Sequence, residues 1–285
     1  MKMKNMSLSR RIVPVIAIGV LACMSGLGNL WAQDGFIQKV GSDCFAKIEY
    51  PAKDNVELNE GTYELWFQVN FEPVRKINEA WYSPMTYLFI GGGKGDERKD
   101  FLCCSYRQVY SKGVNTHGSD ILVASSFGWG MGAQVGDLGW KKGEWHHLTI
   151  TWKRDNNAYA LALYCDGKKI DSIRNAALGK DIPTIGDDWT IRVGAEWLNS
   201  CYGTINAIKI SSVALSAEEI AKNADVKPEA DRFTLLLDTF NKVEKANSQN
   251  GVTVPEKGVQ GKISGMFETV DGKFGPAVKL NAVEE

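Results

Sequence analysis

The stretch "GEWHHLTITW", residues 143–152, places two adjacent histidines in a run that alternates between polar and apolar residues. The chain contains only 3 histidines, so the pair first suggests a metal or catalytic site. In a β-strand, however, successive side chains point to opposite faces. His146 would share one face with Leu148, Ile150 and Trp152, and His147 would share the other with Trp145, Thr149 and Thr151. We therefore predict a framework strand, whose two histidines cannot bind one metal ion without a bulge between them.

Similar short runs, separated by Gly, Asn and Asp, occur on both sides of this strand, and helical periodicity is nearly absent. We expect strands in residues 61–71, 85–93, 100–110, 119–130, 144–152, 158–173, 188–197 and 203–215. Many short strands at close spacing favour a sandwich or a barrel. Asp166-Gly167 predicts a type I′ hairpin turn. A short helix is expected at 216–224, where Ser216 and Glu219 have the spacing of a capping box.

Four of these segments carry a family resemblance. They are "GTYELWFQ" (61–68), "GEWHHLTITW" (143–152), "LALYCDGKKI" (161–170) and "GTINAIKISSVALSAEEI" (203–220). In this order they resemble the laminin G-like, or concanavalin A-like, jelly-roll domain over about residues 36–225, with Asn206 where the family usually has Asp. The resemblance implies an all-β fold, an antiparallel two-sheet jelly-roll sandwich with one short helix near 216–224. It does not specify a function, because the fold hosts lectins, adhesion modules and glycosidases alike.

The first 32 residues have the layout of a secretory signal peptide. Basic residues (Lys2, Lys4, Arg10 and Arg11) precede an apolar run, and the small residue Ala32 offers a cleavage site. We expect a bacterial protein that is secreted or lies in the periplasm or cell envelope. Two alternatives remain. "VLAC" (20–23) resembles a lipobox, which would make Cys23 a lipid anchor, and residues 12–32 are long enough to span a bilayer uncleaved.

The remaining chain divides into a jelly-roll domain at 33–230 and a C-terminal segment at 231–285. In that segment "DRFTLLLDTFNK" (231–242) and "DGKFGPAVKLNA" (271–282) resemble the opening of a second such domain. The segment either folds back to supply the strand that the first domain lacks, or is the remnant of a truncated repeat. We favour the first alternative, because an unpaired sheet edge promotes aggregation.

Charge and cysteine content exclude some classes of function. The chain has 33 basic and 34 acidic residues, and without residues 1–32 it keeps 29 basic ones, for a net charge of −5. Such a balance gives no electrostatic basis for binding nucleic acid. Beyond Cys23 the chain holds Cys44, Cys103, Cys104, Cys165 and Cys201. An odd number without C-x-x-C spacing favours buried apolar cysteines over a disulfide framework.

Few residues suggest catalysis or metal binding. Glycosidases of this fold carry a carboxylate trio on one strand, whereas Glu64 stands alone on the corresponding strands here. We therefore expect a protein that is not an enzyme, although acids from separate loops keep a divergent glycosidase or polysaccharide lyase as an alternative. Calcium is a family option, with Asp120 and Asp188 as loop ligands. The competing interpretation is that both are ordinary polar turn residues.

Aromatic residues near loops give the better functional hypothesis. Five of them lie in or beside segments rich in Gly, Asn and Ser: Trp81, Tyr82, Trp129, Trp140 and Trp197. Flat aromatic faces in loops can stack on sugar rings or on a partner surface. The leading prediction is an exported, non-catalytic module that binds an extracellular polysaccharide or glycoprotein, or mediates adhesion. A structural interaction domain of the cell envelope is the remaining alternative.

Overall fold

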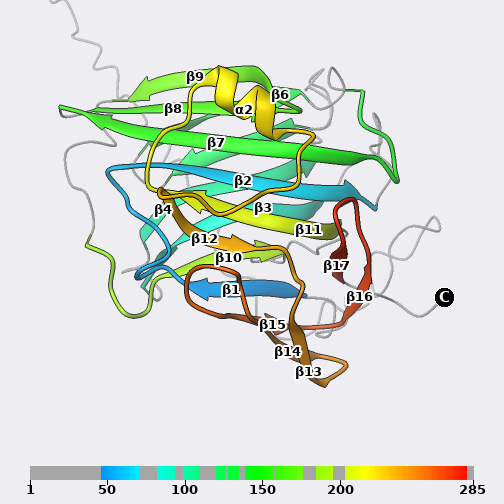
Figure 1. Cartoon of the computed structure of the whole chain (residues 1–285). Helices are drawn as coiled ribbons and strands as arrows, with labels where there is room; N and C mark the ends of the chain where they lie inside the picture. Colours follow the sequence, from blue (N-terminus) through cyan, green and yellow to red (C-terminus); the bar gives the residue numbers. More distant parts are fainter. Residues whose placement is uncertain are drawn as a thin grey trace, which may run out of the picture. The chain divides into compact units, whose positions relative to one another are not determined.

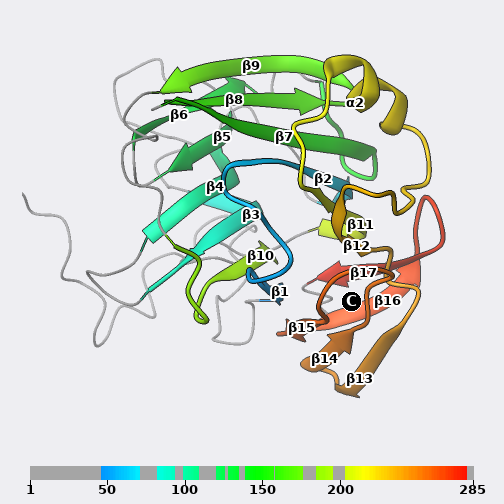
Figure 2. The ribbon, with the colours of Figure 1, turned by 60° about the vertical axis from the view of Figure 1, so that its left-hand side comes forward.

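Two antiparallel sheets form the described part of the chain, as the computed structural model in Figures 1 and 2 shows. Sheet A contains β1 (Lys47–Pro51), β3 (Tyr82–Gly92), β4 (Lys99–Gln108), β5 (Asp120–Ser125), β6 (Gly128–Gln134), β10 (Thr190–Gly194), β13 (Val243–Asn247), β14 (Asn250–Thr253) and β15 (Gly261–Ser264). Sheet B contains β2 (Glu60–Val69), β7 (Trp145–Asp155), β8 (Ala158–Cys165), β9 (Lys168–Asn175), β11 (Gly203–Ser211), β12 (Thr234–Asp238), β16 (Phe267–Asp271) and β17 (Pro276–Leu280). Over the residues that the structure describes, the predicted two-sheet jelly-roll sandwich with one short helix is confirmed.

The structure describes residues 46–70, 82–93, 99–108, 120–125, 128–134, 139–156, 158–175, 184–194 and 203–280. The predicted signal peptide, Cys23, Cys44 and Cys201 lie outside these ranges. Within them, no helix is long and apolar enough to cross a membrane. One expected strand, 119–130, is instead the hairpin of β5 and β6, in which Ser125 pairs with Gly128.

Alternation along β7 confirms how the opening stretch is used. Leu148, Ile150 and Trp152 are fully buried in the core between the sheets, and the intervening threonines face the other side. Gly61 of β2 pairs with Trp152, and a Cβ at Gly61 would lie 2.3 Å from the Trp152 ring. The glycine of "GTYELW" is therefore required by the size of the tryptophan opposite it.

The local motifs also fold as predicted. Asp166 and Gly167 have φ angles of 49° and 74°, as a type I′ turn requires. Helix α2 (Ala217–Asn223) begins after Ser216, whose side chain and that of Glu219 form both halves of the capping box. The helix lies over the outer face of sheet B (Figure 1), where a Cβ at Gly167 would be 2.9 Å from the Cα of Ala221.

The C-terminal segment adds strands to both sheets. Strands β12 and β17 follow one another along the edge of β11 that β2 leaves open, and β15 pairs with β1 in sheet A. Asn206 of β11 fixes this arrangement: its side chain accepts a hydrogen bond from the Phe274 N–H (2.7 Å) and donates one to the Pro276 carbonyl (2.9 Å). The orange and red strands in Figure 2 show the segment beside β1 and β11.

Two of the cysteines that the structure describes behave as small apolar residues, and a third, Cys103, is partly buried. Cys104 and Cys165 are buried and form no disulfide. Burial raises the pKa of both thiols, which keeps them protonated and unreactive at neutral pH.

Candidate functional site

The first histidine of the pair, His146, is a structural residue that joins the start of β7 to the turn between β8 and β9. Its Nδ1 lies 2.9 Å from Oδ2 of Asp166, whose Oδ1 accepts a hydrogen bond from the His147 N–H. Its ring stacks on Trp140 with a centroid distance of 4.4 Å. Burial opposes ionisation of Asp166, but these contacts with His146 and His147 outweigh it and lower the pKa of the carboxyl group.

This lowered pKa predicts a pH-dependent contribution to stability. A depressed folded-state pKa stabilises the fold above the ordinary value of 3.8, and the stabilisation is lost as the pH falls through the folded-state pKa. Asp166→Asn retains a side chain that tolerates positive φ but removes the charge. We expect it to lower the free energy of unfolding by about 1 kcal/mol or less at neutral pH, because the group is half exposed, and by little in strong acid. Urea unfolding at both pH values measures the difference.

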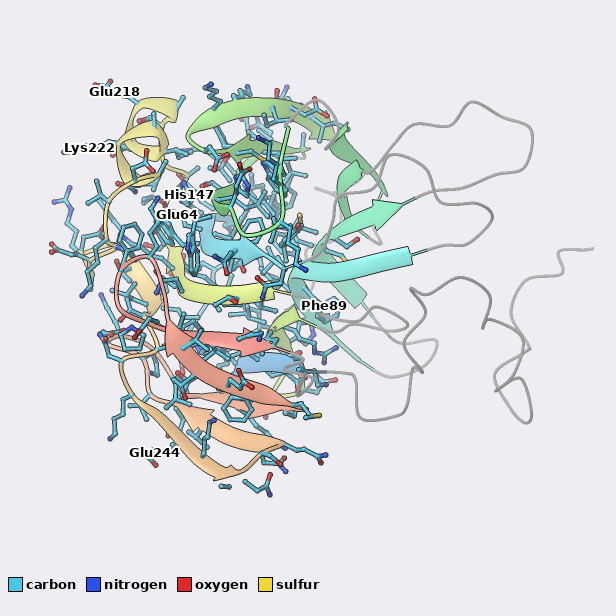
Figure 3. The ribbon with its side chains drawn as sticks, turned by 90° about the vertical axis from the view of Figure 1, so that its right-hand side faces the viewer. Glu64, Phe89, His147, Glu218, Lys222 and Glu244 are labelled. Carbon is cyan, nitrogen blue, oxygen red and sulfur yellow. The ribbon has the colours of Figure 1, made fainter. Side chains whose placement is uncertain are left out.

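The second histidine, His147, points to the opposite face, beneath helix α2. Its Nε2 lies 3.3 Å from Oε1 of Glu64, and its ring stacks on Trp66. Asn223 of α2 also donates a hydrogen bond to Glu64 (3.1 Å). Figure 3 shows Glu64 and His147 together under the helix. The pair therefore does not form one site, and Glu64, which is about 1% exposed, is not accessible to a substrate.

Trp140 is the one predicted binding aromatic whose side chain the structure describes, and its prediction is wrong. The side chain is 5% exposed and packs in the core against Phe67, Tyr87 and His146. A ring buried on both faces cannot stack on a sugar. Tyr82 begins β3 and Trp129 lies in β6, but their side chains are outside the described part of the structure. Trp81 and Trp197 lie outside the described residues altogether.

Of the two predicted calcium ligands, the structure describes the side chain of Asp188. Asp188 is exposed and accepts a hydrogen bond from the Gly93 N–H (2.7 Å), which is the role of a turn-capping residue. Asp120 begins β5, and its side chain is outside the described part. Among the described residues, no group of three or more His, Cys, Asp or Glu side chains is arranged to hold a metal ion. The calcium site remains a prediction.

The outer face of sheet A, on the side of the sandwich away from α2, carries a continuous row of side chains. Cross-strand pairing aligns Val252, Lys262, Glu49, Arg192 and Phe89 on β14, β15, β1, β10 and β3, in that order. Residues directly opposite in neighbouring strands have Cβ atoms about 5 Å apart, so each contacts the next. Their chain neighbours, such as Ile48 and Ile191, point into the core.

Charged contacts hold the middle of this row. Arg192 Nε lies 2.7 Å from Oε1 of Glu49, and Lys47 Nζ lies 3.0 Å from its Oε2. The Arg192 guanidinium also stands 5.1 Å from the centroid of the Phe89 ring, which is close enough for a cation–π contact. The two ion pairs fix the Glu49 side chain in position. Figure 3 shows that Phe89, at the other end of the row, lies on sheet A far from the α2 residues Glu218 and Lys222.

At one end of the row the surface is hollowed into a groove between β1 and the β13–β15 strands. Its volume is about 380 Å³, within the range of about 300–1,000 Å³ for small-molecule sites. The lining residues are Glu49, Pro51, Ala246, Asn250, Gly251, Val252, Gln260, Gly261 and Lys262. They combine two side-chain amides and two charged groups with small apolar surfaces.

This groove was not predicted from the sequence, although the sequence of β1 indicates one of its two walls. In "KIEYP" (47–51) the alternation of buried and half-buried residues marks Lys47, Glu49 and Pro51 as outward-facing. The second wall comes from residues 246–262, and only the pairing of β1 with β15 brings it there. The groove thus joins two segments about 200 positions apart in the chain.

Comparison with known proteins adds a family assignment at the level of the fold. A family model described as the concanavalin A-like lectin/glucanases superfamily matches residues 45–221. No curated protein matches the chain.

Solved structures share the architecture at low sequence identity. A Bacteroides ovatus chain described as a "putative carbohydrate binding protein" is 14% identical, with a TM-score of 0.51, and the match covers 84% of this chain and 58% of that one. This chain therefore spans little more than half the length of the Bacteroides protein. A SAP-like pentraxin from Limulus polyphemus is 12% identical, with a TM-score of 0.41 over 78% of this chain and 96% of that one. At 14% identity, the likeness to the Bacteroides protein shows the fold alone.

Proposed function

Because the chain belongs to the concanavalin A-like lectin/glucanase superfamily, as its motifs predicted, we propose that it is an exported, non-catalytic module that binds carbohydrate in the groove between β1 and β13–β15. The single observation that carries the proposal is the composition of this groove. The name of the Bacteroides protein with the same fold agrees with it.

The lining matches what a sugar presents. Sugar hydroxyls both donate and accept hydrogen bonds, and the amides of Asn250 and Gln260 offer both a donor and an acceptor. Pro51 and Val252 offer apolar surface for the C–H face of a sugar ring. A few polar groups among apolar ones are the usual composition of a ligand site.

The groove also favours binding over hydrolysis. Retaining glycosidases need two carboxyl groups about 5 Å apart, and inverting enzymes need them about 6.5–9.5 Å apart. Of the described residues that line the groove, only Glu49 carries a carboxylate. Both of its oxygens are engaged, by Lys47 and Arg192. A reducing-sugar assay on the polysaccharides that bind checks this point, and release of sugar by the purified chain would restore the glycosidase alternative.

The amide side chains give a direct test of the site. We expect Asn250→Ala and Gln260→Ala each to weaken binding to a glycan-array hit by about three- to tenfold, since one hydrogen bond contributes about 0.5–1.5 kcal/mol. Titration calorimetry with the purified chain measures the loss. Asn59→Ala is the matched control, because this exposed asparagine lies outside the groove.

Two results would count against the proposal. An array on which no glycan binds would remove the carbohydrate-binding function itself. Binding that survives both amide substitutions unchanged would place the sugar elsewhere on the molecule.

A further inference from the structure

We infer that the glycan held in this groove is anionic, with carboxylate or sulfate groups on its sugars, and that the ammonium group of Lys262 pairs with them. The inference rests on the proposed carbohydrate-binding function and specifies the class of sugar. It follows from how charge is distributed along the row of side chains on sheet A.

Among the described residues at this end of the sheet, Lys47, Arg192 and Lys262 lie around the carboxylate of Glu49. Lys47 and Arg192 occupy the two oxygens of Glu49, at 3.0 and 2.7 Å. Lys262 lies directly opposite Glu49 in the pairing of β15 with β1, yet its ammonium has no ion-pair partner among the described residues. Each oxygen of Glu49 already has a cationic partner, and Lys262 is the exposed cation in the lining that is left for a ligand.

The acidic residue nearest along the row does not change this balance. Glu244 lies on β13, opposite Val252, and pairs with Lys242 at 3.3 Å. Among the described lining residues, the charge left without an ion-pair partner is therefore the positive charge of Lys262, on a chain whose formal net charge is −1. This local positive charge attracts an anionic ligand to the groove, although the chain as a whole is slightly negative.

The rest of the lining is placed to complete the contact. An anionic group on Lys262 would leave the adjoining hydroxyls of the same ring near the amides of Asn250 and Gln260, which belong to the same groove. A neutral sugar could use these amides and accept a hydrogen bond from the ammonium, but it would gain no charge–charge attraction. The difference in affinity between an anionic polymer and a neutral polymer of the same backbone therefore measures the contribution of Lys262 to binding.

Matched pairs of polymers test the inference on the full chain. Affinity electrophoresis is run in gels that contain polygalacturonate or its methyl-esterified form, and dextran sulfate or dextran. We expect retardation by at least one anionic polymer, weaker retardation by its neutral counterpart, and a decrease as sodium chloride is raised. The galacturonate pair reports on carboxylate and the dextran pair on sulfate.

Lys262→Gln should weaken binding to the anionic polymer by about two- to fivefold, the range expected for one exposed ion pair. Lys222→Gln is the matched control, because Lys222 is an exposed lysine on α2 over the other sheet (Figure 3). A thermal melt of both variants shows whether the fold is kept.

The outcomes separate the inference from the function on which it rests. Equal retardation by charged and neutral polymers, or glycan-array hits confined to neutral sugars, would overturn the anionic class and leave carbohydrate binding in place. An equal loss in Lys222→Gln would show diffuse charge attraction and would also overturn the role of Lys262. Absence of binding to every polymer and every array glycan would overturn both.

Discussion

A chain that ends at residue 230 is expected to lose cooperative folding, although it keeps all of residues 45–221, the region that the family model matches. The deletion removes the six strands β12–β17 and leaves the edges of β1 and β11 unpaired. It also removes apolar side chains that are at most 3% exposed: Leu236, Leu237, Phe240, Ile263, Phe267, Ala277, Val278 and Leu280. Each large one contributes about 1.5–3 kcal/mol. Their sum is comparable to the whole stability of about 5–15 kcal/mol of a typical domain.

Circular dichroism during heating, together with gel filtration of the purified protein, measures this loss. Two leucines on β12 provide a graded control: Leu236 is fully buried, whereas Leu235 is half-buried. Leu236→Ala should cost about 2–5 kcal/mol and Leu235→Ala clearly less. A shortened chain that melts cooperatively within a few degrees of the full chain would show that the C-terminal segment does not contribute to the core.

Local signals in the sequence were sufficient to predict the framework. The alternation of "WHHLTITW" fixes which side chains share a face, and it separates His146 from His147 as the structure confirms. The Asp166-Gly167 turn and the capping box of α2 depend on residues within four positions of each other. Short-range steric and hydrogen-bonding preferences determine these features, so one sequence suffices.

Long-range contacts determined what the sequence could not predict. Glycine and lysine beside Trp140 are typical of a surface loop, but strands β2, β3 and β7 each supply an aromatic side chain that buries its ring. The groove needs the register in which Lys262 faces Glu49, and neither segment carries a signal for the other. Pairing between distant strands is set by burial of the whole sheet, which no single segment encodes.

Asp238→Ala is expected to lower the free energy of unfolding by about 3–5 kcal/mol, because it leaves several buried hydrogen-bond donors without a partner. The carboxylate is fully buried and accepts hydrogen bonds from the Tyr50 hydroxyl (2.8 Å), the Thr253 hydroxyl (2.6 Å) and the Phe240 N–H (2.8 Å). It thereby connects β12 of sheet B to β1 and β14 of sheet A. Urea unfolding at neutral pH measures the change.

The same substitution should also weaken glycan binding. Tyr50 lies between the groove residues Glu49 and Pro51, and Thr253 follows Val252, so the contact with Asp238 fixes both walls. We expect a larger loss of affinity in Asp238→Ala than in Leu235→Ala, which leaves this contact intact. Equal affinities in the two folded variants would show that the walls keep their positions without Asp238.

The pH dependence of stability distinguishes Asp238 from Asp166. Burial raises the pKa of Asp238, even though hydrogen bonds from Thr253, Phe240 and Tyr50 act in the opposite direction. Its contribution is therefore fully present below the ordinary value of 3.8 and is lost as the pH rises through the folded-state pKa. The free energy of unfolding of the wild-type chain should exceed that of Asp238→Asn by the largest amount in acid. This difference should shrink as the pH rises toward neutral. For Asp166→Asn the difference should grow over the same range, because the pKa of that carboxyl is lowered. If both differences change with pH in the same direction, one of the two electrostatic assignments is wrong.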